Sequence, residues 1–448
     1  MNRSIDLALL VKHDRPAPDY GLFPTLVRLP EKRSADDYRL VALASNEDPI
    51  PKPLTVYVHV PSWLGHDSRG PVRYLGYLKR EIALQSALFD GDRRIERLVL
   101  SGNGAGRLGD GQLAGLLAEL DVHFGLKRSR DRDFALRIDS RGLSLRRLPL
   151  LAALGFNRLL VDMQDLETPA GVPGERQPAD EWPAPAGPER SHPPVTELAL
   201  RLSGRTAVGF SALLERLVSL HPERITLYRD GLCGAAVWPA FSCPSAPWQR
   251  IATPERGAVL ALLAQGVERL VPAGYVHLGM GRFALASDAL VAAQRHGRLR
   301  RCLEGYSLQG EADCIGLGAG AISHLDDGYY QNARELPDYC ARLDAGQLAI
   351  CRGYELTADD RVRQAVIQHL MGGGNVRYAT VEKAHRIVFR NYFAPELLAL
   401  QAMAGDDLVE LRRDGIEPTQ SGSLLMERLV MLFDGAFGEG RARYLQMI

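Results

Sequence analysis

From Leu54 onward, short apolar runs alternate with stretches in which apolar residues recur every three or four positions. The apolar runs predict strands over residues 56–60, 95–100, 134–138, 158–161, 224–228 and 275–280. The helical periodicity predicts helices over residues 74–88, 112–120, 145–154 and 256–270. Repeated strand and helix units are typical of a parallel sheet, and their number favours a partial (β/α) barrel over a single dinucleotide-binding half. The predicted fold class is therefore α/β.

Other segments of the chain do not follow this pattern of alternating strands and helices. Residues 1–50 contain one short apolar stretch and a turn-rich segment, which predicts an N-terminal arm. Eight prolines between residues 168 and 195 exclude a regular helix there and predict a surface loop. The partial barrel is expected over 51–325.

Beyond the glycine-rich run that ends near residue 323, the pattern predicts mostly helix. Thr357 and Asp360 have the spacing of a capping box before a helix. A small β element over 407–411 and a long terminal helix over 419–437 are typical of a helical, winged-helix-like domain. The expected C-terminal domain spans 326–448.

Charge and hydropathy narrow the range of partners. The 448 residues are 46% hydrophobic, and 54 basic residues balance 54 acidic ones, so no net charge attracts nucleic acid or an anionic membrane. No apolar run approaches the roughly 18 residues that cross a bilayer. We expect a cytoplasmic monomer without membrane or nucleic-acid contacts. A small-molecule ligand and a protein partner both stay open.

The six cysteines lie in the second half of the chain, and no two form a Cys-x-x-Cys pair. We therefore expect reduced core thiols rather than a local metal site.

Candidate chemistry concentrates in the loop after the first strand, because active sites of α/β proteins form at the carboxyl ends of strands. His59, His66 and Asp67 are ligand types for a single zinc or ferrous ion, although a structural role is the more common one. A Ser62 or Ser68 nucleophile with His66 as its base is a weaker hypothesis, because such close neighbours rarely supply an oriented base.

Two glycine-rich runs are further candidates for a ligand-binding site. Residues 102–106 follow a strand and have the composition of a phosphate cradle, but their spacing misses the dinucleotide fingerprint. A tight turn is the simpler interpretation. Residues 316–320 are interpreted as a place of close backbone packing.

Motifs spread along nearly the whole chain resemble the oxygen-independent coproporphyrinogen III dehydrogenases, which are radical S-adenosylmethionine enzymes. The motifs are Asp6–Leu9 with Tyr20 and Phe23–Thr25, Tyr57–Pro61, Gly155–Leu159, Gln164–Asp165, Gly305–Tyr306 with Gln309–Gly310, Gly316–Gly318 with Ala321–Ser323, and Arg352–Gly353 with Leu356–Thr357 and Asp359–Asp360. The resemblance implies a partial barrel that holds a 4Fe-4S cluster and S-adenosylmethionine. It also implies oxidative decarboxylation of two propionates of coproporphyrinogen III in haem synthesis.

The chain departs from the family where the cluster is bound. Family members ligate the cluster through three cysteines spaced Cys-x-x-x-Cys-x-x-Cys. By register from His59 and Pro61, these positions are Trp63, Asp67 and Gly70. A glycine and an indole offer iron no ligand, and an aspartate oxygen is a poor substitute for thiolate. We therefore assign no metal ligand, no catalytic residue and no bound cofactor.

The resemblance places a remnant of the S-adenosylmethionine pocket at Tyr57, Gly102, Gln164, Arg176 and Ile322. The family's glycine motif is here Ser101-Gly102-Asn103-Gly104-Ala105, and an acidic family position aligns with Arg137. Trp63 is expected to fill the cluster cavity or to stack on a tetrapyrrole. Arg69 and Arg137 are candidates for pairing with porphyrin propionates.

Three functions follow from these observations. The first is a protein of haem metabolism that lacks radical chemistry and binds a tetrapyrrole or a partner. The second is an active coproporphyrinogen III dehydrogenase, forming protoporphyrinogen IX, whose cluster is held by other ligands such as Cys233, Cys243, Cys302 or Cys314. The third is a regulatory protein that interacts through its C-terminal domain.

Overall fold

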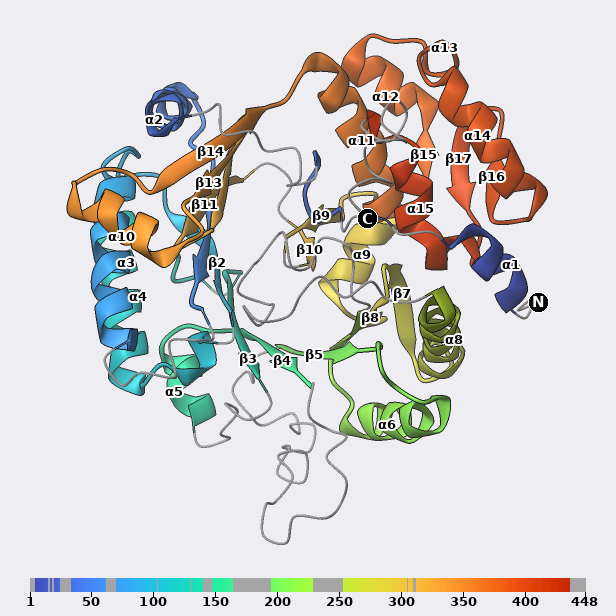
Figure 1. Ribbon diagram of the computed structural model, residues 1–448, viewed down its shortest axis with the longest axis horizontal. Coiled ribbons are helices and arrows are strands. Elements are labelled where there is room, and N and C mark those ends of the chain that lie inside the picture. Colours follow the sequence, from blue (N-terminus) through green and yellow to red (C-terminus); the bar gives the residue numbers. More distant parts are fainter. Residues whose placement is uncertain are drawn as a thin grey trace, which may run out of the picture.

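One twelve-stranded sheet, curved into an open barrel, organises the chain (Figure 1). The computed structural model describes residues 5–14, 17, 20–24, 34–61, 70–102, 104–129, 131–139, 147–163, 195–228, 253–303, 305–308 and 312–435. The strand order is β14-β13-β12-β11-β1-β2-β3-β4-β5-β6-β8-β7. β14 and β7 are the two edges, so the barrel is partial, as predicted.

Seven neighbouring strands of the sheet run parallel. They are β11 (Asp313–Leu317), β1 (Leu54–His59), β2 (Ile95–Ser101), β3 (Asp133–Asp139), β4 (Arg158–Asp162), β5 (Val195–Arg201) and β6 (Arg224–Tyr228). Every residue of β1 and β4 is buried, which is the burial expected where both faces of a parallel sheet are covered. The expected strands over 56–60, 95–100, 134–138, 158–161 and 224–228 are confirmed.

Antiparallel strands extend the sheet at both edges. β7 (Tyr275–Gly279) and β8 (Arg282–Leu285) form a hairpin next to β6, and β12 (Ile322–Leu325), β13 (Gly328–Asn332) and β14 (Ile350–Glu355) continue from β11. The prediction of mostly helix after residue 323 was therefore wrong for this stretch. The sheet continues past the expected domain boundary at residue 325, as far as Glu355.

Helices cover the outer face of the barrel (Figure 1). They are α3 (Gly70–Ser86), α4 (Asp110–Phe124), α5 (Leu148–Ala153), α6 (Ala207–Leu220) and α8 (Thr253–Leu270), with the short turn η4 (Ala105–Arg107) after β2. α9 (Ala289–Arg295) and α10 (Leu336–Asp344) follow later in the chain. The helices expected over 74–88, 112–120, 145–154 and 256–270 are confirmed, with shifted ends. The expected proline-rich loop lies largely outside the described residues.

The N-terminal arm contains two helices, α1 (Leu7–His13) and α2 (Ala35–Ala44), followed by the turn η2 (Ser45–Glu47). Lys12 and His13 both contact the Asp406 carboxylate of the C-terminal domain. Arg93 binds the carbonyls of Ser45 and Lys52 and pairs with Asp313 of β11. The arm is thereby tied to both the barrel and the C-terminal domain.

The C-terminal domain is mostly helical and carries a small antiparallel sheet. Its elements are α11 (Ala358–Gly373), β15 (Val376–Arg377), α12 (Tyr378–His385), α13 (Phe389–Tyr392), α14 (Ala394–Gly405), β16 (Val409–Leu411), β17 (Gly415–Pro418), η7 (Gly422–Leu425) and α15 (Met426–Met431). A separate hairpin of β9 (Arg300–Cys302) and β10 (Gly305–Ser307) lies earlier in the chain, before β11. Thr357 and Asp360 form the expected capping box at α11.

The prediction of one long terminal helix over 419–437 was wrong for the described part of this segment. The described part of this segment is a 3-10 turn followed by a helix that ends at Met431. Thr419 donates its N–H to the Leu408 carbonyl, and a Cβ on Gly422 would lie 1.8 Å from that same oxygen. The chain is therefore held against β16 where the helix was expected to begin. None of the described helices combines the length and apolar character needed to cross a membrane.

Candidate functional site

The carboxyl ends of β1 to β6 meet at one edge of the barrel, which we call the mouth. Side chains alternate along each strand, so every second residue points to the inner face of the barrel. The loop that follows β1, residues 62–69, lies outside the described residues, and with it lie Ser62, Trp63, His66, Asp67, Ser68 and Arg69. Gly70, the third expected cluster position, is the first residue of α3.

The residues present do not fit a cysteine-ligated cluster. Glycine at position 70 has no side chain to offer iron, and the sequence has no cysteine at positions 63 and 67. Within the described ranges, no three His, Cys, Asp or Glu side chains lie together in a way that could hold a metal ion. Of the alternative ligands, Cys302 and Cys314 are described, whereas Cys233 and Cys243 are not.

The glycine turn after β2 packs directly on the end of β1. Gly102 has a φ of +83°, and a Cβ on Gly102 or on Gly104 would lie 2.2 Å from a carbonyl oxygen of Val60 or Pro61. Gly104 donates its N–H to the Val60 carbonyl, and Ala105 donates to the Gly102 carbonyl. The turn thus uses these backbone groups internally, which favours the tight-turn interpretation over a phosphate cradle.

His59 ends β1 at the mouth and is only 1% exposed. Burial lowers the pKa of His59 to about 3, so its imidazole is neutral at ordinary pH. Its carbonyl accepts a hydrogen bond of 2.8 Å from the Tyr74 hydroxyl on α3, and that hydroxyl in turn accepts from the Ala319 N–H. The backbone of β1 is therefore fixed to α3 and to the glycine-rich turn after β11.

Glu81 makes a second link between α3 and that turn, two helical turns beyond Tyr74. One carboxylate oxygen accepts from the Gly318 N–H at 2.7 Å and from the Tyr339 hydroxyl at 2.6 Å, and the other accepts from the Asn332 amide. The side chain is fully buried. Burial raises the pKa of Glu81 to about 7, although these three donors act in the opposite direction.

The raised pKa of Glu81 predicts a pH-dependent stability. The folded protein keeps the Glu81 proton up to about pH 7, whereas the unfolded chain loses it near pH 4.5. This contribution to stability is therefore fully present below about pH 4.5, and roughly 3 kcal/mol of it is lost as the pH rises from there through about 7. Denaturant unfolding of wild type and Glu81→Gln at pH 4 to 8 measures it.

The stability difference between wild type and Glu81→Gln should change by that amount across the range. Glu268→Gln, on the exposed surface of α8, is the matched control and should show no such change. A difference that stays constant with pH would show that Glu81 titrates normally.

The inner face of the barrel holds a buried network of ion pairs. Arg97 donates to Asp133 at 2.9 Å, and Arg158 donates to the same carboxylate at 3.0 Å. On the next strand, Glu197 accepts from Arg282 at 3.0 Å and from the Thr226 hydroxyl at 2.7 Å. Described members of the network are the cations Arg97, Arg158, Arg224 and Arg282 and the carboxylates Asp133, Glu197 and Asp288. Cations are thus in excess.

Arg137 lies nearer the mouth, on β3. Its guanidinium is 3.2 Å from a carboxylate oxygen of Asp162 on β4, and the Tyr228 hydroxyl donates to Asp162 at 3.1 Å. The Arg137 side chain is 18% exposed, whereas that of Asp162 is 3% exposed. A guanidinium therefore reaches the surface of the inner face at a position where the family resemblance predicts an acid.

The five residues expected to form the remnant of the S-adenosylmethionine pocket lie in different parts of the chain and are not all described. Tyr57 is buried on the inner face, where its hydroxyl accepts from Arg97 at 3.0 Å. Ile322 is buried with Tyr329 and Leu356. Gly102 lies in the glycine turn, while Gln164 and Arg176 fall outside the described residues.

The ion-pair network was not expected from the sequence. Its signal is present, since Arg97, Asp133, Arg158 and Glu197 each interrupt an otherwise apolar strand. A charge within an apolar strand points to a paired, inward-facing side chain, but the pairing itself depends on the closure of the barrel.

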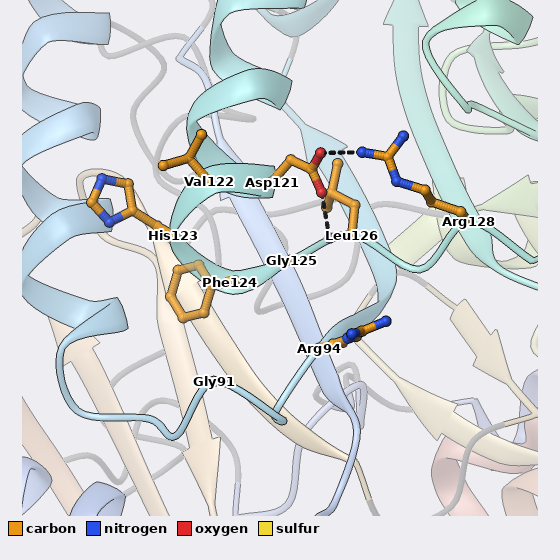
Figure 2. A pocket seen from close by; sticks show the side chains of 9 residues that line it. All are labelled: Gly91, Arg94, Asp121, Val122, His123, Phe124, Gly125, Leu126 and Arg128. Carbon is orange, nitrogen blue, oxygen red and sulfur yellow. Dashed lines mark hydrogen bonds and ion pairs between the residues drawn. The ribbon is translucent and has the colours of Figure 1, made fainter.

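A surface pocket lies at the opposite edge of the barrel (Figure 2). It is lined by Gly91, Arg94, Asp121, Val122, His123, Phe124, Gly125, Leu126 and Arg128, at the end of α4 and before β2. Asp121 is already paired with Arg128 and with the Leu126 N–H. These residues lie at the amino ends of the strands, away from the mouth, and we assign them no chemistry.

Comparison with known proteins yields relatives over nearly the whole length. An oxygen-independent coproporphyrinogen III oxidase from Pseudomonas aeruginosa is 32% identical over 445 residues, which cover 96% of this chain and 95% of the relative. An enzyme of the same name from Escherichia coli is 30% identical, covering 96% and 95%. No protein-family model matches the chain.

A solved structure agrees with these relatives. Coproporphyrinogen III oxidase (HemN) from Escherichia coli, a radical SAM enzyme, matches with a TM-score of 0.80 and 27% identity, covering 97% of this chain and 100% of that one. This match confirms the predicted α/β fold of the radical S-adenosylmethionine type. The identity and coverage of the relatives show that the chain belongs to the oxygen-independent coproporphyrinogen III oxidase family.

Proposed function

We propose that this protein binds a carboxylate-bearing tetrapyrrole at the barrel mouth and performs no radical chemistry there. The relatives are named for coproporphyrinogen III, a tetrapyrrole with four propionate side chains. The full-length scaffold supports retention of a related ligand, and the replaced cysteine positions support loss of the cluster. A catalytic role would need iron ligands other than those of the family.

The guanidinium of Arg137, whose side chain is 18% exposed, carries the binding part of the proposal. Arginine pairs with carboxylates through two parallel hydrogen bonds, which suits a propionate. Nη2 of Arg137 donates to one carboxylate oxygen of Asp162 at 3.2 Å. Deeper in the barrel the cations of the network outnumber its carboxylates, four to three among the described residues, which favours an anionic ligand over a cationic one.

Titration with coproporphyrin III, the stable oxidised form of that tetrapyrrole, tests the proposal. We expect saturable binding with one ligand per chain, followed by absorbance or fluorescence quenching. Arg137→Met should weaken binding roughly 10- to 100-fold, because a hydrogen bond to a charged group contributes about 1.5–3 kcal/mol. Arg128→Met, on the opposite edge and 83% exposed, should bind like the wild type.

The same titration with the tetramethyl ester of coproporphyrin III separates propionate recognition from general adhesion of a flat ring. The ester should bind much more weakly than the free acid. Equal binding of both forms, or no saturable binding of either, would contradict the proposal.

The active enzyme with other cluster ligands is the second candidate. Its supporting observation is that Cys302 lies on the inner face of the barrel and Cys314 packs against the apolar residues of that face. Iron reconstitution distinguishes it from the first candidate. We retain the third hypothesis, a partner bound by the C-terminal domain, only as an expectation from the sequence.

A further inference from the structure

Cys302 ends β9 and places its sulfur on the inner face of the barrel. Its Sγ atom lies 3.5 Å from Nη1 of Arg97, which reaches across from β2. Tyr57, Val99, Ala135 and Leu160 form the apolar surface beside it, against which Leu303 and Cys314 pack. Cys302 itself is partly exposed.

The Arg97 guanidinium beside the sulfur has one unused nitrogen. Nε donates to Asp133, and Nη1 donates to the Tyr57 hydroxyl and to the Cys302 sulfur. Nη2 is buried and has no hydrogen-bond partner among the residues that the structure describes, and the Arg97 side chain is only 2% exposed. A buried donor without an acceptor is costly, so this position favours an added oxygen or anion.

The charges around the sulfur favour the thiolate form. Burial alone would disfavour ionisation, but Arg97, the neighbouring Arg301 and a hydrogen bond from Tyr57 together lower the pKa of Cys302. A thiolate would also offset the excess of cations in the network. Burial instead raises the pKa of Cys314 to about 12 and also raises that of Cys340. The arginines therefore distinguish Cys302 from these two cysteines.

We propose that Cys302 is a redox modification site, whose thiolate is oxidised by hydrogen peroxide to a sulfenic acid held by Nη2 of Arg97. The sulfur attacks one peroxide oxygen, so that an S–O bond forms as the O–O bond breaks. The second oxygen leaves as hydroxide and is released as water after it takes up a proton. The sulfur is oxidised by two electrons and the peroxide is reduced by two, and no further reactant is needed.

The partial burial of Cys302 limits the size of the oxidant that we expect to react with it. Leu303 and Cys314 pack against the apolar residues around Tyr57, so we expect a small uncharged peroxide to react with Cys302 and a bulky disulfide such as oxidised glutathione not to react. The inference concerns a sulfur of the inner face and does not depend on tetrapyrrole binding at Arg137.

Peroxide treatment of the full-length protein, with dimedone trapping and site-resolved mass spectrometry, tests the proposal. We expect Cys302 to be labelled at least 10-fold faster than Cys314 and Cys340. Tyr57→Phe keeps the ring and removes the hydroxyl, so labelling of Cys302 at pH 7 should slow roughly 2- to 10-fold, the effect of one hydrogen bond. Cys302→Ser should remove that label and leave the labelling of the other cysteines unchanged.

The pH profile of the wild type keeps the test independent of how well a variant folds. Alkylation of Cys302 by iodoacetamide should follow an apparent pKa below the roughly 8.5 of an ordinary thiol. Labelling of Cys302 no faster than that of Cys340, or an apparent pKa above this value, would overturn the proposal.

Discussion

Replacing Glu197 with glutamine is expected to lower the free energy of unfolding by roughly 3–5 kcal/mol. The Glu197 side chain is 6% exposed and lies between Arg282, at 3.0 Å, and Arg158, at 3.8 Å. Burial opposes its ionisation, but Arg282, Arg158 and Arg224 overcome this and lower the pKa of Glu197. An amide of the same size would remove the buried negative charge that Arg282 and Arg158 share.

The matched control for this prediction is Glu215→Gln. Glu215 also pairs with an arginine, Arg269, but on the protein surface, where the two side chains are 64% and 50% exposed. An exposed ion pair contributes about 0–1 kcal/mol, so the control should be close to wild type. Chemical denaturation of the three proteins at one pH measures both effects. A loss for Glu197→Gln no larger than that of the control would show that the inner face is open to water.

The ion-pair network reaches a residue of the expected S-adenosylmethionine pocket. On the inner face of the described barrel, Arg97 donates to the Tyr57 hydroxyl at 3.0 Å and Arg137 pairs with Asp162. Tyr57 is one of the positions that the resemblance assigns to the S-adenosylmethionine pocket. In this chain the Tyr57 hydroxyl accepts a hydrogen bond from Arg97, which joins it to the ion-pair network.

The regular part of the fold could be predicted from hydrophobic periodicity. The strand expected over 224–228 is β6 to the residue, and α8 ends at Leu270 as expected, because apolar residues in these elements face one continuous core. Strand β5 was not expected, since Glu197 and Arg201 interrupt its apolar run. Helix α6 is also absent from the expected elements, although Phe210, Leu213, Leu214 and Leu217 have the spacing of an amphipathic helix.

The glycine-rich region after residue 305 was harder to interpret. β11 to β13 are strands of four or five residues each, and Gly316 and Gly328 lie where a Cβ would be within 2.4–2.6 Å of neighbouring atoms. Such close packing depends on partners that come from distant parts of the sequence. Local propensity therefore indicates a turn-rich segment, and only the assembled sheet explains these glycines.

The candidate site, like the fold, could be predicted only in part from the sequence. The sequence alone locates the loop after β1, and the family resemblance places the cluster positions at Trp63, Asp67 and Gly70. It does not show that Arg97 joins Tyr57, Asp133 and Cys302, because these residues come from β2, β1, β3 and β9. A charged residue within a strand is visible in the sequence, but its partner is not.

Anaerobic reconstitution with iron and sulfide tests the central claim most directly. The purified protein is desalted after incubation, its iron is counted, and it is then mixed with S-adenosylmethionine and a reductant. The Escherichia coli coproporphyrinogen III oxidase, a radical SAM enzyme, serves as the positive control. Because Trp63, Asp67 and Gly70 offer no thiolate, we expect no stable cluster and no cleavage of the cofactor. About four irons per chain, together with cleavage of S-adenosylmethionine, would contradict the account and establish an active enzyme with other ligands.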